Sequence, residues 1–219
     1  MPSGLVVNIF GEQTIELPDT VPVMVLPTVL FPHSLLPLHI FEPRYRAMLD
    51  AALSDERMFC IALLRRGVQE WKSPGDFHEI AGLGLVRACV GRPDGTSDLI
   101  LQGLVRVKFV GFDTRSPFPI AEIEALTSIP AATHDAPPLI AKLLGLCARL
   151  REHGHSVPQA VDDQLARIEN PDLLSDIVAH TFLRDPFRRQ DVLEELRVGE
   201  RLRLLIRHLS TEMVLSEES

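Results

Sequence analysis

The segment from residue 21 to residue 41 constrains the fold most, because it is strongly apolar yet regularly interrupted by proline. It reads VPVMVLPTVLFPHSLLPLHIF, 21 residues without a charged side chain, which is long enough to suggest a membrane-spanning helix. Proline occupies positions 22, 27, 32 and 37. Each proline lacks an N–H group and clashes with the preceding helical turn, so a continuous helix is excluded. Since a non-helical segment cannot satisfy its backbone in lipid, the sequence predicts strand and turn buried in a soluble fold.

The rest of the first half is patterned mainly as strands. We expect strands over residues 14–17, 21–26, 34–40, 59–64, 81–90, 99–112 and 118–126. Pro43, followed by apolar residues at helical spacing, predicts one helix. The sequence Pro93-Asp94-Gly95 indicates a β-hairpin turn, and Gly103 indicates a bulge or bend in the returning strand. Alternation over residues 105–109 predicts that one face of that strand meets water.

The pattern changes to helices near Ser128. Asn170 and Asp185 each precede a proline, which is typical of a capped helix start. The last helix carries one apolar face, and we expect its interleaved arginines and glutamates to form a solvated face with intrahelical ion pairs. The order of elements predicts an α+β fold, with a β-rich unit over residues 1–127 and a helical bundle over residues 128–219.

Composition and the N-terminal sequence weigh against several classes of protein. The formal net charge of -8 weighs against a general nucleic-acid binder, which needs a basic surface. Three cysteines, far apart in apolar surroundings, indicate buried thiols in a reducing compartment. The N-terminus has no basic region or cleavage pattern of a signal peptide, so we expect a cytoplasmic protein without a membrane anchor.

Three ordered motifs carry a family resemblance. The first is VMVLPTVLFPHSLLPLHIFEPRYRAML, the second is GLGLVRACVGRPDGTSDLILQGLVRVKF, and the third combines NPDLLSDIVAH with QDVLEELRVGERLRLLIRHL. Together they resemble the N-terminal domain of the Lon protease family over about residues 15–215. The resemblance implies a PUA-like β pseudo-barrel with one inserted helix, followed by a helical bundle. In that family the domain is thought to help recognise and hold protein substrates.

The sequence departs from full Lon proteases in its catalytic parts. An ATPase module of that family would show GxxxxGK[ST], in which backbone amides and a lysine hold the phosphates, but the pair Gly-Lys is absent here. The Ser-Lys dyad of the family belongs to a separate C-terminal domain, which we do not find after Ser219. The resemblance is therefore to a free-standing N-terminal domain, and we expect no enzyme activity and no cofactor.

Candidate contact residues lie at the start of the predicted helix. Glu42, Arg44, Tyr45 and Arg46 have two readings, a capped helix with solvated charges or a rim that contacts unfolded polypeptide. Trp71, in a polar loop, would indicate a contact site if it were exposed, and folding back onto the barrel is an equal alternative.

The histidines do not suggest a metal site. His33 and His39 match no zinc-ligand spacing, and we expect no metal. His33 and Ser34 belong to no hydrolase triad, because the chain has no GxSxG elbow and neighbouring strand residues point to opposite faces.

Two hypotheses of different classes follow. The leading one is a non-catalytic protein-binding module for unfolded or exposed polypeptide, acting with a protease or chaperone. The alternative is RNA binding, since PUA-like folds include RNA binders, although the acidic balance and the shortage of lysine weigh against it.

Overall fold

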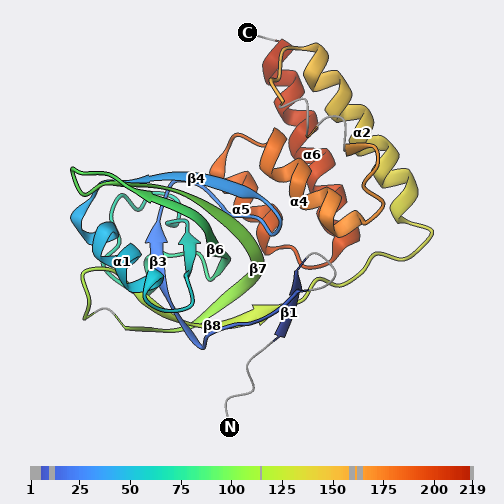
Figure 1. Ribbon diagram of the computed structural model, residues 1–219. Coiled ribbons are helices and arrows are strands. Elements are labelled where there is room, and N and C mark those ends of the chain that lie inside the picture. Colours follow the sequence, from blue (N-terminus) through green and yellow to red (C-terminus); the bar gives the residue numbers. More distant parts are fainter. Residues whose placement is uncertain (1–5, 10–12, 114, 158–160, 162–164, 218–219) are drawn as a thin grey trace. The chain divides into compact units, whose positions relative to one another are not determined.

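The computed structural model describes residues 6–9, 13–113, 115–157, 161 and 165–217 (Figure 1). The chain divides into two compact units, Met1–Leu126 and Thr127–Ser219. Among the described residues, the named strands lie in the first unit and long helices dominate the second, so the predicted α+β class is confirmed.

The first unit is built from strands and one long helix. Its elements are β1 (Val6–Ile9), β2 (Gln13–Glu16), β3 (Thr20–Val25), β4 (Leu35–Ile40), α1 (Pro43–Leu53), β5 (Met58–Ala62), the 3-10 helix η1 (Pro74–Asp76), β6 (Ile80–Gly91), β7 (Ser97–Asp113) and β8 (Ile120–Leu126). Every strand predicted from the sequence is present within a few residues of its expected bounds.

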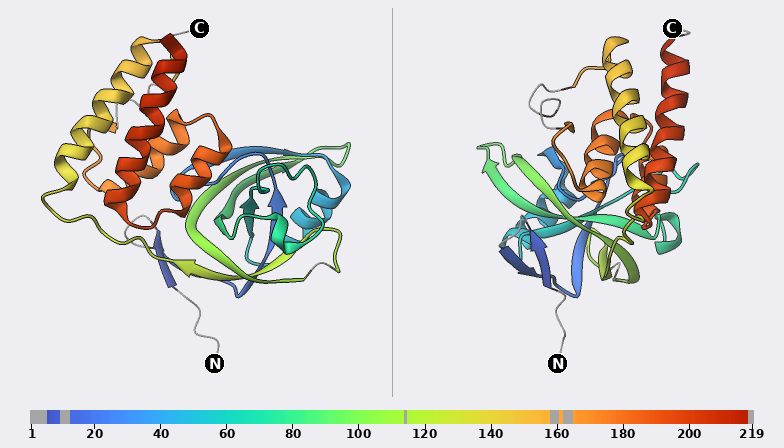
Figure 2. Two further views of the ribbon diagram at one scale, coloured as in Figure 1. Left: turned by 180° about the vertical axis from the view of Figure 1, so that it is seen from behind. Right: turned by 90° about the vertical axis from the view of Figure 1, so that its right-hand side faces the viewer.

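Five strands close into a ring. The order is β7-β6-β5-β3-β8, and β8 pairs back onto β7. Only the β3–β5 pair is parallel among these pairings. Figures 1 and 2 show the long strands β6 and β7 curving around this unit. The expected pseudo-barrel with one inserted helix is therefore present, as an irregular ring.

The C-terminal half of β6 and the N-terminal part of β7, which pair with each other, extend beyond the ring. Residues 86–91 of β6 pair with residues 97–101 of β7, and β4 pairs with residues 97–102 of β7 on the other side. We call these three segments the three-stranded extension. β4 lies at one edge of it, and the half of β6 that continues beyond its pairing with β5 lies at the other.

The first part of the apolar run of residues 21–41 forms β3, and this strand is buried on both of its faces. Val21 and Val23 belong to one core cluster, and Met24 belongs to a second cluster that includes residues of α1. A strand buried on both faces needs a continuous apolar run, which explains the absence of charge around β3.

The Phe-Pro-His turn lies directly on two strands of the ring. The side chains of Leu30 and Phe31 are fully buried. A methyl group on Gly82 would clash with the Leu30 carbonyl, and one on Gly103 would clash with the Phe31 carbonyl. The expected bulge beside Gly103 is confirmed as a register shift between β6 and β7. Glycine is therefore required where one backbone crosses another.

One predicted exposure in β7 is wrong. Lys108 faces water as expected, but Arg106 is only 3% exposed. Strand alternation identified the two faces of β7 correctly. It did not show that Arg106, on the face opposite Val107 and Phe109, is buried as well.

The second unit is helical. It contains α2 (Ala136–Glu152), α4 (Pro171–Phe182), α5 (Pro186–Glu194) and α6 (Val198–Glu217). The predicted caps are confirmed, since Asn170 accepts from the N–H groups of Asp172 and Leu173, and Asp185 caps α5 in the same way. The α6 helix packs against α2, α4 and α5.

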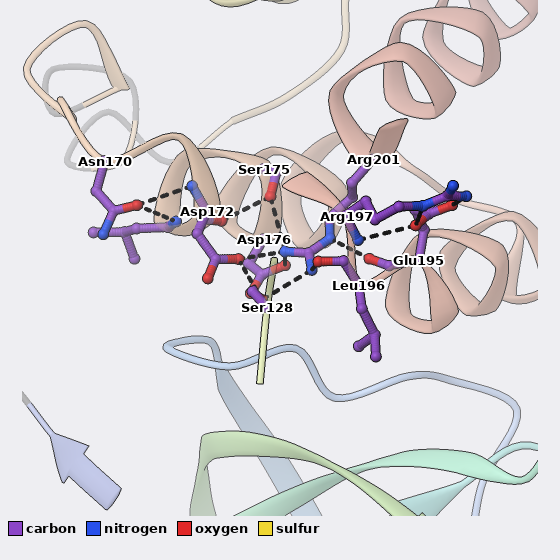
Figure 3. A network of polar contacts seen from close by, with 10 residues as sticks. Ser128, Asn170, Asp172, Ser175, Asp176, Glu195, Leu196, Arg197 and Arg201 are labelled. Atoms are coloured by element: carbon purple, nitrogen blue, oxygen red, sulfur yellow. Dashed lines mark hydrogen bonds and ion pairs between the residues drawn. The ribbon is translucent and has the colours of Figure 1, made fainter. Parts of the chain in front are cut away.

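A buried arginine holds part of this unit together (Figure 3). Arg201 of α6 is fully buried, and its guanidinium pairs with the Asp172 carboxylate of α4. It also donates to the Ser128 hydroxyl at 3.0 Å and, through Nε, to the Glu195 carbonyl at 2.7 Å. The expectation that the arginines of the last helix are solvated is wrong for Arg201, which connects α4, α6 and the segment before α2.

The exposed arginines of α6 match the expectation better. Arg203 pairs with Glu200 at 2.8 Å, three residues earlier on the same helix. None of the helices in the described residues combines the length and apolarity needed to cross a membrane.

Candidate functional site

The edge strand β4 presents alternate side chains to solvent. Leu36, Leu38 and Ile40 pack toward the core. The intervening residues point the other way, and Leu35 is 54% exposed. Phe41, which continues the alternation, is 60% exposed. Such large apolar side chains are costly to leave in water, so this row is a candidate contact surface.

Neighbouring strands continue the same exposed face. Pro37 lies opposite Ile100 of β7, and Ala88 of β6 lies opposite Ile100 on the other side. Val90 of β6 is 66% exposed. A shallow pocket of about 420 Å³ is lined mainly by these residues. We call this surface the β4 face, formed by Leu35, Pro37, His39, Phe41, Ala88, Val90, Asp98 and Ile100.

The charges on the β4 face are paired with each other. Asp98 accepts a hydrogen bond from Arg92 Nε at 2.7 Å and lies 2.7 Å from His39 Nδ1. Hydrogen bonds from His39 and Arg92 lower the pKa of Asp98. The His39 ring also stacks on Phe41, with ring centroids 6.0 Å apart. The face is thus apolar with one neutralised carboxylate, an arrangement suited to contact with apolar groups.

The predicted contact residues at the start of α1 separate into two groups. Glu42, Arg44 and Arg46 lie at the surface, where Arg44 donates to Glu42 at 3.0 Å. The Arg46 guanidinium lies against the hairpin turn at Gly95. Tyr45, in contrast, is only 5% exposed.

Tyr45 anchors α1 to β3. Its hydroxyl donates to the Val25 carbonyl at 3.1 Å and accepts from the Val25 N–H at 3.3 Å. Burial raises the pKa of Tyr45. The structure therefore places this ring under the charged helix start, and Arg44 covers it with its guanidinium 4.6 Å from the ring centroid.

Trp71 lies away from this helix start, in the loop between β5 and β6. It is partly buried and packs against the ring core, with its ring centroid 5.9 Å from that of Phe77. The sequence left open whether Trp71 is an exposed contact residue or folds back onto the barrel, and in the structure it folds back.

The two histidines near β4 have different roles: His39 lies on the β4 face, and His33 is part of the turn before the strand. His33 takes a left-handed backbone conformation, with φ 65°, and its N–H donates to the Gly103 carbonyl. No cluster of three potential metal ligands occurs among the described residues.

Sequence reasoning missed the exposure of Leu35 and Phe41. Both lie in the run of residues 21–41 that we expected to be buried, and the structure corrects that expectation. The strand expected over residues 81–90 gave no indication that Val90 is exposed. The available signal was the pattern of residues 35–40, in which Pro37 and His39 alternate with Leu36, Leu38 and Ile40. Polar and proline residues on one face of a strand indicate an exposed face and an edge.

Comparison with known protein families matches residues 20–211 to the ATP-dependent protease La (LON) substrate-binding domain. Among curated proteins, the chain is 28% identical over 204 residues to a Lon protease of Desulfosudis oleivorans, covering 91% of this chain and 25% of that protein. It is 25% identical over 207 residues to a Lon protease of Dictyoglomus thermophilum, covering 94% of this chain and 26% of that protein. The chain thus spans about a quarter of the length of these relatives.

Solved structures show the same fold. The N-terminal domain of the Mycobacterium avium complex Lon protease aligns with a TM-score of 0.67 at 22% identity, covering 87% of this chain and 98% of that one. A Lon N-terminal domain protein from Xanthomonas campestris aligns with a TM-score of 0.63 at 16% identity, covering 86% and 97%. Since the family match extends over both units, this chain belongs to the Lon substrate-binding domain family.

Proposed function

We propose that this chain is a non-catalytic module that binds unfolded or exposed polypeptide and works together with a protease or chaperone in the cytoplasm. The observation that carries the proposal is the β4 face, where Leu35, Phe41 and Val90 are each more than half exposed. An apolar patch of this kind on a folded domain is typical of a protein-contact surface.

The chemistry of the face favours unfolded chains over small polar ligands. Unfolded chains expose apolar side chains that a native protein buries, and such side chains gain free energy when they leave water. The pairing of Asp98 with Arg92 and His39 means that no unpaired charge of this cluster is buried when an apolar group binds.

We propose Glu42, Arg44 and Arg46 as the charged rim of this surface. They follow Phe41 directly in the chain, and interfaces commonly surround an apolar centre with a polar rim. Tyr45 then supports the rim from below. We propose Trp71 as a further contact, made through the part of its side chain that remains exposed.

A binding titration tests the proposal. Fluorescently labelled casein, which is unfolded, is titrated with the purified chain and followed by anisotropy, and a stably folded protein of similar size serves as the control. We expect saturable binding of casein and none of the folded protein. Absence of casein binding at all accessible concentrations would contradict the proposal.

The same titration with single-stranded RNA addresses the alternative function. Binding to RNA releases counterions, so its affinity would fall steeply as salt rises. We expect no RNA binding at low salt, whereas apolar binding to casein changes little with salt. Tight RNA binding with a steep salt dependence would favour the alternative.

A further inference from the structure

The outer edge of β4 carries backbone groups without partners among the described residues. β4 pairs only with β7 in the described part of the chain. The Gly103 N–H donates to the Ser34 carbonyl at 2.9 Å, which sets the alternation of the ladder. In an antiparallel pair, alternate residues point both backbone groups toward or away from the partner strand. Residues 36, 38 and 40 therefore face β7, and residues 35, 37 and 39 face outward.

Proline at position 37 agrees with this assignment. Pro37 has no N–H to give and lies opposite Ile100 of β7, so an outward position leaves the β4–β7 ladder intact. The outer edge thus offers the N–H groups of Leu35 and His39, together with the carbonyls of Leu35, Pro37 and His39. These are five of the six groups that an uninterrupted edge of this length would present.

The same three residues also direct their side chains onto the β4 face. In an extended strand, the direction of the backbone groups and that of the side chain alternate together. A strand paired with Leu35 and His39 would therefore place alternate side chains beside Phe41 and the pocket of about 420 Å³. The edge and the face together form one continuous surface for an extended chain.

We propose that polypeptide binds by adding a strand to the outer edge of β4, with apolar side chains at alternate positions lying on the β4 face. This inference rests on the proposed function and specifies its mode. The occupant is an extended segment of an unfolded chain, because the edge requires a partner with free N–H and carbonyl groups, and a folded protein has already used most of its own. Because Asp98 is already paired with His39 and Arg92, the bound peptide needs no charged residue to neutralise it.

Backbone methylation of a peptide separates strand addition from simple apolar contact. The probe is a peptide in which valine and threonine alternate over six residues, the length of β4, with lysines at both ends for solubility. Two further versions carry N-methyl groups, one on the valines and one on the threonines. Methylation removes N–H donors but leaves every side chain unchanged.

Strand addition predicts an asymmetric result, measured by calorimetry with the full chain. One methylated version loses affinity by at least about tenfold, because its donors toward β4 are gone. The other version, whose methyl groups face solvent, binds within about twofold of the parent. Equal affinity of all three peptides would overturn strand addition while leaving the proposed function intact. Failure of casein and the parent peptide alike to bind would overturn both.

A variant of the protein gives the complementary test. Pro37→Val supplies the missing donor on the edge and keeps an apolar side chain of similar size. We expect it to bind the parent peptide about twofold to tenfold more tightly, the effect of about one net hydrogen bond. The control is Pro117→Val, an exposed proline outside β4, which should leave the affinity unchanged.

A second copy of the chain could occupy the same edge. Sedimentation of the wild type at the concentrations used for binding decides this outcome. We expect a monomer with a free edge. A dimer that blocks peptide binding would overturn the proposal by assigning the edge to β4 of another copy.

Discussion

At the scale of single residues, the contact between two backbones at the Phe-Pro-His turn has the largest consequence for folding. The carbonyls of Leu30 and Phe31 lie where side chains would otherwise stand on β6 and β7. The turn closes over the ring only because Gly82 and Gly103 leave that space. These glycines therefore contribute to stability because they have no side chain that would clash with the turn.

Substituting either glycine tests this contact. We expect Gly82→Ala and Gly103→Ala each to lower the free energy of unfolding by about 1–3 kcal/mol, the usual cost of an overpacked site. The matched control is Gly91→Ala in the same strand β6, where the added methyl meets nothing closer than 4.0 Å. Chemical denaturation measures all three, and equal stabilities would show that the turn can move away at little cost.

His180 makes the second unit sensitive to acid. Burial, and then the positive charge of Arg189, lower the pKa of His180 to about 4. The unfolded chain, with an ordinary pKa of about 6.5, binds a proton more readily than the folded one between these two values. Stability should therefore fall as the pH drops from about 6.5 toward 4, by of order 1–3 kcal/mol.

The variant His180→Gln removes this contribution. Denaturation at several pH values should give a shallower loss of stability over that window, although His208, whose pKa burial also lowers, keeps part of the slope. Identical pH profiles of variant and wild type would exclude His180 as a cause.

At the scale of elements, Arg201 connects three segments of the helical unit. Replacing it with alanine leaves the buried Asp176 carboxylate and Asp172 without their shared cation. We expect Arg201→Ala to lower the stability of this unit by about 3–5 kcal/mol, as for other broken buried ion pairs.

The control for Arg201 is Arg203, a partly exposed arginine on the same helix. Arg203→Ala breaks a solvent-screened pair with Glu200 and should cost less than about 1 kcal/mol. Thermal unfolding followed by circular dichroism distinguishes the two variants. Similar midpoints for both would mean that the network of Arg201 adds no net stability.

Helix starts and the hairpin turn could be predicted from the sequence because neighbouring residues determine them. Pro171 after Asn170 and Pro186 after Asp185 place the starts of α4 and α5 to the residue, because capping depends on neighbours in sequence. The hairpin at Pro93-Asp94-Gly95 is confirmed for the same reason, and Gly95 has φ 81°.

Burial was less predictable where distant segments decide it. Arg201 resembles its solvated neighbours in sequence, yet Asp172 and Ser128, far away in the chain, make its burial possible. Phe41 directly follows the edge strand β4, and Val90 lies in the part of β6 beyond its pairing with β5, so both positions depend on the strand order. The alternation over residues 35–40 indicates an exposed strand face, but only the pairing of β7 with both β4 and β6 brings Val90 onto the same surface.

At the scale of the whole molecule, the chain corresponds to the substrate-binding part of much longer proteases. It spans about a quarter of those relatives, and the family match lies within that part. We propose binding without catalysis for this chain, and the central claim of that proposal is that the β4 face, in the first unit, makes the contact with unfolded polypeptide.

The most direct test of that claim is the affinity for casein of a variant in which Phe41 and Val90 are both replaced by serine. Both side chains are more than half exposed, so the fold should keep its stability. The matched control is Val110→Ser, which removes a 50% exposed side chain outside the face. The account predicts at least about tenfold weaker binding for the double variant and unchanged binding for the control. Equal affinity of all three proteins for casein would contradict it.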